Sequence, residues 1–184
     1  GVAHICKNCR DSKSVCREQL RATLRSSYNS YWKRTIHPVL PIVEHHYDHI
    51  PRRIIIEEFI PENDDWKIHV YGGRVLFVEL CTNRKGSNIR KVAMSRNYEP
   101  LPWKRFRKRY CKPLQAPKPG RWEDMMRISE ELASRLVGDE YVRVDLYLSQ
   151  GRVYFGELTF TPNGARGRFD PVSVDLELAK AKAL

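Results

Sequence analysis

The segments YVRVDLYL (residues 141–148) and VYFGELTF (residues 153–160) decide the fold of this chain. Both are rich in β-branched and aromatic residues, and a glycine lies between them, so together they predict a β-hairpin. Because side chains alternate across a strand, Arg143 and Asp145 are expected on one face, with the valines and leucines on the other. An acid in the middle of an apolar strand needs a partner, and Glu157 occupies the middle of the second strand.

The two carboxylates allow two explanations that the pattern alone does not separate. Arg143 can form a salt bridge with one or both acids, since buried charges are stable only when they are paired. Alternatively, Asp145 and Glu157 can hold Mg²⁺, a hard cation that prefers carboxylate oxygens, phosphates and water. A shared metal ion requires that both acids emerge on the same face of the hairpin.

This requirement leads to a prediction about the connecting turn. A two-residue turn at 150–151 would place Asp145 and Glu157 on opposite faces of the hairpin. A three-residue loop, residues 149–151, with its glycine in the left-handed conformation pairs Arg143 with Glu157 and makes the two acids diagonal neighbours. We therefore predict the three-residue loop, with both carboxylates pointing into a cleft beside the strand that ends at position 60.

Hydrophobic periodicity predicts the other elements of the chain. Residues 122–138 begin with acids and continue with an apolar stripe, which predicts a core-facing helix. Residues 66–80 alternate around Gly72-Gly73, which predicts a second hairpin with a tight turn. Three further patterns predict a basic helix at residues 14–35, a buried strand at residues 53–60, and a long ordered excursion with short pieces of structure at residues 82–120.

The charge of the chain favours an anionic ligand. Its 184 residues include 33 Lys plus Arg against 22 Asp plus Glu, a formal net charge of +11. Such a surface attracts nucleotides, nucleic acid, acidic polymers or anionic lipid. The densest basic run, residues 104–112, is interpreted as a solvated loop or edge, although its aromatic residues can also stack on bases or sugars. No apolar stretch approaches 18 residues, so a soluble protein is expected.

Two groups of possible metal ligands are interpreted otherwise. Cys6, Cys9 and Cys16 have only His4 nearby, whereas a structural zinc site shows two pairs of ligands. Free thiols in a reducing cytoplasm are expected instead. The histidines at positions 45, 46 and 49 lack a matching carboxylate or cysteine spacing and are expected near a helix end.

Read together, these sequence words resemble the ATP-grasp superfamily. The word RVDL (143–146) and the stretch GRVYFGELTFTPNG (151–164) are similar to the closing segment of ATP-grasp proteins, which runs Arg-x-Asp, a turn, Glu-x-Asn and then Pro-Gly. Residues 56–60 (IEEFI) look like the adenine-binding hinge strand of that superfamily. The chain most resembles the ATP-grasp proteins of teichuronopeptide and capsular-polysaccharide biosynthesis, which share the DWK type of word at 65–67.

The resemblance implies a metal site at the hairpin of residues 141–160. Asp145 and Glu157 would hold Mg²⁺ that bridges the phosphates of ATP. Thr159 stands where the wider superfamily has a ligand asparagine, so the third protein ligand is Thr159, or Asn163 or water takes its place. Mg²⁺ and ATP are therefore the expected cofactors.

The resemblance also implies the contacts to the nucleotide. Lys67 and Arg143 would face the phosphate charge and act as the catalytic cations. Backbone groups of the hinge would meet the adenine edge, and an acid after the hinge would reach the ribose hydroxyls. The expected nucleotide-binding residues are Glu57, Glu58, Phe59, Ile60, Glu62 and Asp64.

The expected fold is α+β and ATP-grasp-like, a mostly antiparallel sheet with packed helices and an incomplete first lobe. The incompleteness is inferred because no glycine-rich run precedes Gly72-Gly73. Residues 1–52 are expected to be a remnant of the N-terminal lobe with the basic helix, and residues 53–184 the C-terminal subdomain. Affinity for Mg-ATP is expected to be weak, because each lost charge-assisted hydrogen bond is worth about 1.5–3 kcal/mol.

The implied function is that of a cytoplasmic ATP- and Mg²⁺-dependent ligase. Such an enzyme activates a carboxylate as an acyl phosphate, which an amine or similar nucleophile then attacks. The expected substrate is an anionic sugar polymer, or its precursor, of the cell surface. The alternative is a catalytically degenerate basic module that binds an anionic polymer or nucleic acid through residues 104–112. Replacement of Asp145 distinguishes the two, because it disables only the enzyme.

Overall fold

The computed structural model describes residues 17–18, 21–22, 57–60, 64–82, 90–105, 117–162 and 167–181. The chain divides into two compact units, residues 1–59 and 60–184. In the first unit the described residues near position 20 are helical and exposed, inside the predicted basic helix. No helix in these ranges is long and apolar enough to cross a membrane.

The predicted strand at 53–60 is wrong in its described part. Residues 57–60 form no strand, and the first three of them are exposed. Only the preceding residues 54–56, which lie outside the described ranges, have a strand-like β-branched sequence. The two glutamates that follow carry charges that favour solvent and are uncommon in strands, so the pattern does not extend to them.

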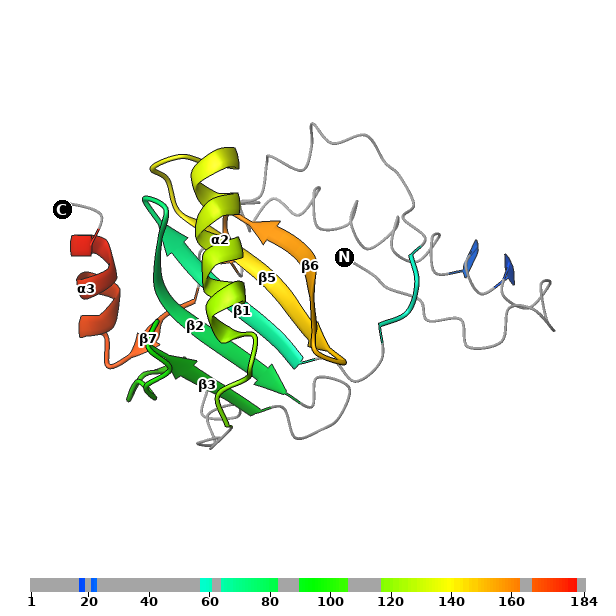
Figure 1. Ribbon diagram of the computed structural model, residues 1–184. Helices are drawn as coiled ribbons and strands as arrows, with labels where there is room; N and C mark the ends of the chain where they lie inside the picture. Colours follow the sequence, from blue (N-terminus) through cyan, green and yellow to red (C-terminus); the bar gives the residue numbers. More distant parts are fainter. Residues whose placement is uncertain are drawn as a thin grey trace. The chain divides into compact units, whose positions relative to one another are not determined.

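The second unit is built on an antiparallel sheet of five strands, in the order β3-β2-β1-β5-β6, with a helix across one face (Figure 1). These elements are β1 Asp64–Tyr71, β2 Arg74–Thr82, β3 Arg90–Met94, α2 Trp122–Leu136, β5 Val142–Ser149 and β6 Arg152–Thr159. The described part of the unit is completed by a short strand pair and a helix: β4 Lys104–Arg105, β7 Phe169–Asp170 and α3 Ser173–Ala181. This is the α+β arrangement that the sequence predicts.

Helix α2 confirms the predicted core-facing helix. Glu123 and Asp124 lie in its first turn, where the helix dipole favours negative charge. Its apolar side packs on alternate residues of β1 and β5. Trp122 is fully buried and meets the rings of Trp66 and Tyr98 edge-on, with ring centroids 5.8 Å and 4.8 Å apart. Tyr98 shows that apolar packing orders the described residues 90–105 of the predicted excursion.

The opposite face of the sheet carries the intervening side chains of the same strands. Strand β1 presents Asp65, Lys67 and His69 there, and its neighbour β5 presents Arg143 and Asp145. All five are buried. At one end of this face a second, smaller apolar cluster joins the sheet to β7 and α3 through Phe77, Phe169 and Val174. A polar row and an aromatic cluster therefore lie side by side on the face away from α2.

Both hairpins turn through two residues with positive φ. Gly72 (φ 54°) and Gly73 (φ 70°) form the predicted tight turn between β1 and β2. Gln150 (φ 49°) and Gly151 (φ 72°) connect β5 to β6, with Ser149 paired to Arg152. The predicted three-residue loop is therefore wrong. Gln150 adopts the left-handed conformation, and two such residues form the turn whose twist best matches the flanking strands.

A bulge at Gly156 restores the parity that the two-residue turn would break. Leu146 pairs with Phe155 and Asp145 pairs with Glu157, so Gly156 is an extra residue in β6. Beyond the bulge, each side chain of β6 returns to the face that the longer loop would have given it. Asp145 and Glu157 thus share a face as directly opposed residues rather than diagonal neighbours.

Gly156 is required at the bulge because a side chain has no room there. A Cβ atom would lie 2.9 Å from the Asp145 carbonyl oxygen and 2.9 Å from Cε2 of Tyr147. The first of these atoms is backbone and cannot move without disturbing the strand pair. The ring of Tyr147 therefore covers the bulge and limits the position to glycine.

We predict that Gly156→Ala lowers the free energy of unfolding by about 1–3 kcal/mol, because the new methyl group overpacks the strand pair. Urea denaturation measures the change. Gly120→Ala is the control, since a Cβ there meets no atom within 4 Å and the backbone carries no positive φ. Equal stability of the two variants would contradict the bulge as described.

Candidate functional site

The candidate site is a buried polar cluster on β1, β5 and β6. Asp145 and Arg143 of β5 are 2% and 7% exposed, and Lys67 of β1 is 5% exposed. Lys67 lies directly opposite Asp145 in the antiparallel pairing of the two strands. The alternation of the strands brings these charges together, because their neighbours on either side face the α2 core.

Arg143 is the centre of the cluster and contacts three side chains. Its Nε donates to Oδ1 of Asp145 at 2.5 Å, and its Nη2 donates to Oδ2 at 2.8 Å, a two-pronged ion pair. The same Nη2 donates to Oε1 of Glu157 at 3.1 Å and to Oγ1 of Thr159 at 2.9 Å. The Thr159 hydroxyl in turn donates to Oε1 of Glu157 at 3.0 Å. These contacts place all four residues on one face of the hairpin.

Lys67 connects the cluster to β1. Its Nζ donates to Oδ2 of Asp145 at 2.5 Å and to Oδ1 of Asp65 at 3.1 Å. Asp145 therefore accepts hydrogen bonds from two different cations on neighbouring strands. Burial lowers the pKa of Arg143, but its hydrogen bonds to Asp145 and the charges of Asp145 and Glu157 outweigh this, so the pKa lies above its ordinary value. Arg143 stays charged at any physiological pH.

The salt bridge anticipated for Arg143 is thus present, and the donor chemistry also fits Mg²⁺. Three carboxylates, Asp65, Asp145 and Glu157, lie among two cationic side chains, which leaves one negative charge in excess. The Glu157 side chain is 61% exposed, so its carboxylate can meet a ligand from solvent. Among the described residues, no three His, Cys, Asp or Glu side chains form a metal-binding group. Phosphate and water oxygens would have to complete the coordination shell.

Of the other predicted site residues, Ile60 and Asp64 belong to the second unit. Glu57, Glu58 and Phe59 belong to the first unit, while Glu62 and Asn163 lie outside the described residues. Further predictions also fall outside them: the cysteines at 6, 9 and 16, the histidines at 45, 46 and 49, and most of the basic run.

Asp64 begins β1 on the face of Trp66, opposite to the cluster. Partial burial raises the pKa of the Asp64 carboxyl. Burial also raises the pKa of Tyr98, and the charge of Asp64 raises it further, which places these two groups near each other. The structure therefore separates Asp64 from the cations Lys67 and Arg143 by the thickness of the sheet.

Sequence reasoning missed a second group of side chains next to the cluster. His69 is stacked on Phe77, with ring centroids 4.0 Å apart and planes at 18°. Its Nδ1 shares a hydrogen bond of 2.7 Å with the hydroxyl of Tyr141, and its Nε2 lies 3.7 Å from Oε2 of Glu79. The alternation of β1, which puts His69 on the face of Lys67, was the available signal.

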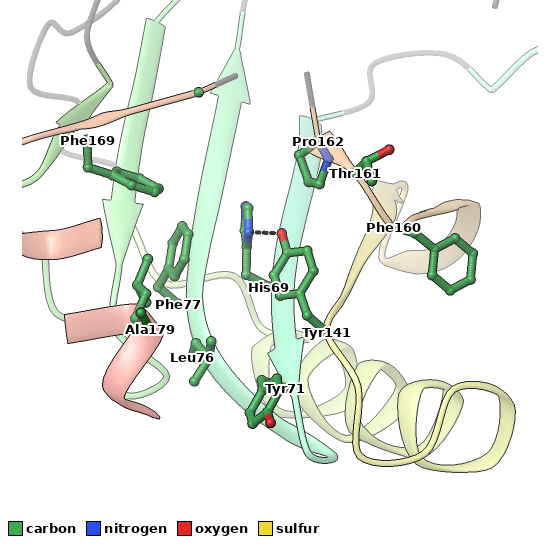
Figure 2. Close-up of a pocket in the computed structure, with 12 residues that line it drawn as sticks. His69, Tyr71, Leu76, Phe77, Tyr141, Phe160, Thr161, Pro162, Phe169 and Ala179 are labelled. Atoms are coloured by element: carbon green, nitrogen blue, oxygen red, sulfur yellow. Dashed lines mark hydrogen bonds between the residues drawn. The ribbon is translucent and has the colours of Figure 1, made fainter. Parts of the chain in front are cut away.

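His69, Phe77 and Tyr141 line a cavity of about 350 Å³ (Figure 2). The cavity is bordered by β1, β2, the ends of β5 and β6, β7 and α3. Its described lining residues are His69, Tyr71, Leu76, Phe77, Tyr141, Phe160, Thr161, Pro162, Gly167, Phe169, Leu178 and Ala179. The cavity borders the polar cluster, because His69 is the pairing partner of Arg143 across β1 and β5.

Comparison of the sequence with known proteins identifies its family. The sequence matches the family model described as TupA-like ATPgrasp over residues 6–181. The chain belongs to the TupA-like ATP-grasp family. No curated protein matches it, and no solved structure matches it.

The family match confirms the resemblance to ATP-grasp proteins of the teichuronopeptide type and the ATP-grasp α+β fold. It also supports an ATP-dependent, ligase-type function, since ATP-grasp proteins generally use ATP and Mg²⁺. The match does not identify the substrate. The assignment of individual residues therefore depends on the geometry of the cluster.

Replacement of Lys67 by Met is predicted to reduce the free energy of unfolding by about 3 kcal/mol, because Asp65 and Asp145 would keep buried charge with one cation fewer. Unfolding in urea measures the loss. Adding Asp65→Asn should recover part of it by removing one carboxylate. The matched control, Lys118→Met, breaks a solvent-exposed pair with Glu123 and should change little. A loss no larger than that of the control would contradict the cluster.

Proposed function

We propose that this protein is an ATP- and Mg²⁺-dependent ligase that activates a carboxylate as an acyl phosphate for attack by a nucleophile. The observation that supports the proposal is the cluster of Arg143, Lys67 and Asp145 beside the exposed carboxylate of Glu157. Phosphoryl transfer needs little covalent help from a protein, since positioned cations stabilise the charge that develops.

Lys67 and Arg143 are the proposed catalytic cations. Both are buried and held by carboxylates, and a bound Mg²⁺ ion would change the net charge of the cluster from −1 to +1, which favours a phosphate in a region where water screens charge little. Arg143 presents a planar group suited to two phosphate oxygens, whereas Lys67 acts as a point charge. Their partner Asp145 fixes both groups in place, which reduces the rearrangement needed when an anion binds.

Mg²⁺, when bound, would neutralise phosphate charge and would be held by Asp145, Glu157 and Thr159. Glu157 supports this assignment best, because its side chain is both exposed and tied to the cluster through Arg143. Thr159 donates its hydroxyl proton to Glu157 and so orients that carboxylate. Asp145 already accepts from two cations, so it would share its oxygens between them and the ion.

The nucleotide base belongs, in this proposal, at the hinge that precedes β1. Backbone groups of residues 58–60 would bind the adenine edge, and Glu62 or Asp64 the ribose. Residues 1–52 would supply the rest of the N-terminal lobe. Because Asp64 lies on the opposite face of the sheet from Lys67 and Arg143, Glu62 is the better candidate for the contact to the ribose.

The proposed substrate is an anionic polymer, or its precursor, from cell-surface polysaccharide assembly. The net charge of +11 would attract such a molecule. Because ATP is consumed, the reaction would take place in the cytoplasm. The rival function, a basic module without catalysis, depends on residues 104–112, of which only 104–105 are described.

The proposal is tested by Glu157→Gln, which removes one carboxylate charge at an exposed position. We expect calorimetric titration to show Mg-ATP binding weakened at least about tenfold, with the stability of the fold little changed. Glu99→Gln, an equally neutral change at an exposed position away from the cluster, should bind like the wild type. Unaltered affinity in Glu157→Gln would argue against a metal ion at this hairpin.

A further inference from the structure

The cavity beside the polar cluster offers few hydrogen-bonding partners to a ligand. Most of its described lining residues are aromatic or aliphatic, and none is Lys or Arg. A sugar ring or uronic acid placed there would lose water from several hydroxyl groups without gaining partners, which is unfavourable. The anionic polymer of the proposed function therefore does not fit this cavity.

The polar groups of the lining are few. The hydroxyl of Tyr141 is held by His69, and Glu79 lies on the far side of the His69 imidazole. Thr161 adds a hydroxyl that is buried and makes no hydrogen bond within the described residues. A buried hydroxyl in that state is unfavourable by about 1–3 kcal/mol unless a ligand or water satisfies it. Such a lining favours a ligand with an apolar body and one polar group.

The charge near the cavity also favours a particular polar group on the ligand. Oε2 of Glu79 lies 3.7 Å from Nε2 of His69, and the rings of Phe77 and Phe169 meet edge to face near the cavity. Negative charge and aromatic faces attract an ammonium group rather than a carboxylate. Phe160 is 47% exposed at the cavity rim, an apolar surface that a ligand could cover.

The cavity lies beside the proposed catalytic cations on the same face of the sheet. Lys67 stands in the middle of β1, and His69, which lines the cavity, follows it by two residues of extended strand, about 7 Å. Thr161, another lining residue, follows Thr159 by two positions. A nucleophile bound in the cavity would therefore be close to an acyl phosphate formed at the cluster.

We propose that this cavity binds the nucleophile, a primary amine whose apolar or aromatic body packs against Phe77, Phe169 and Leu178. The amine is held at the Tyr141–His69 pair. This inference rests on the proposed ligase function, because only an acyl phosphate formed at the cluster gives the amine something to attack. In that step the bound ammonium group first gives one proton to solvent, and the neutral amine nitrogen then forms the new bond to the acyl carbon. Phosphate leaves with the electrons of the broken C–O bond and takes the second proton from the nitrogen.

The test uses phenethylamine as the probe and the full chain as the protein. Saturation-transfer NMR and titration measure its binding with and without saturating Mg-ATP. Ala179→Phe fills the cavity from an exposed position on α3 and is expected to weaken probe binding at least tenfold. Tyr141→Phe removes one hydrogen bond and is expected to weaken it about three- to tenfold. The control Leu176→Phe, on an exposed part of α3 outside the cavity, should bind like the wild type.

The outcomes separate the two proposals. Wild-type binding that persists with Mg-ATP present and is lost in Ala179→Phe supports the amine pocket. If Mg-ATP binds but phenethylamine does not, if glucuronate binds more tightly than the amine, or if Ala179→Phe binds normally, the pocket assignment is wrong. Competition between Mg-ATP and the probe would mean that the cavity holds the nucleotide base and would also overturn it. If Mg-ATP itself fails to bind, the ligase proposal is wrong, and so is the proposed role of the cavity in binding the nucleophile.

Discussion

The carboxylate of Asp145 is held between Arg143 on its own strand and Lys67 on the neighbouring strand, and the site depends on that contact. A buried carboxylate without a partner would be strongly destabilising, and here two cations compensate its charge. The pairing of β1 with β5 brings Lys67 to this position across 78 residues of sequence. The same pairing places His69 beside Arg143 and thereby forms the wall of the cavity. The strand register, the compensation of charge and the formation of the site therefore all depend on the pairing of β1 with β5.

The bulge at Gly156 extends this constraint to β6. The two-residue turn at 150–151 alone would direct Glu157 toward the α2 core, where a charge has no partner. One extra residue reverses the parity and brings Glu157 and Thr159 to Arg143. Bulges are common next to active sites because they redirect a side chain without breaking the sheet. The glycine in the motif therefore has a structural role alongside the acids that flank it.

Much of this arrangement could be predicted from the sequence, because alternation and turn residues act locally. The two hairpins, the helix after Gly120 and the common face of Arg143 and Asp145 all follow from short-range patterns. The length of the loop between β5 and β6 could not be predicted, since glutamine gives no signal for a left-handed conformation. A glycine within a strand pattern is a signal for a bulge, and it was available at position 156. The Tyr141–His69 pair depends on strand pairing over 72 residues, which no local pattern reveals.

The central claim is that the cluster on β1, β5 and β6 binds the phosphates and metal of a nucleotide. A crystal structure of the protein with Mg²⁺ and a non-hydrolysable ATP analogue tests it most directly. The account predicts a metal ion between Asp145 and Glu157, phosphate oxygens within hydrogen-bond distance of Lys67 and Arg143, and the base near the start of β1. A nucleotide bound elsewhere, with Lys67 and Arg143 still fully engaged by Asp145, would contradict it.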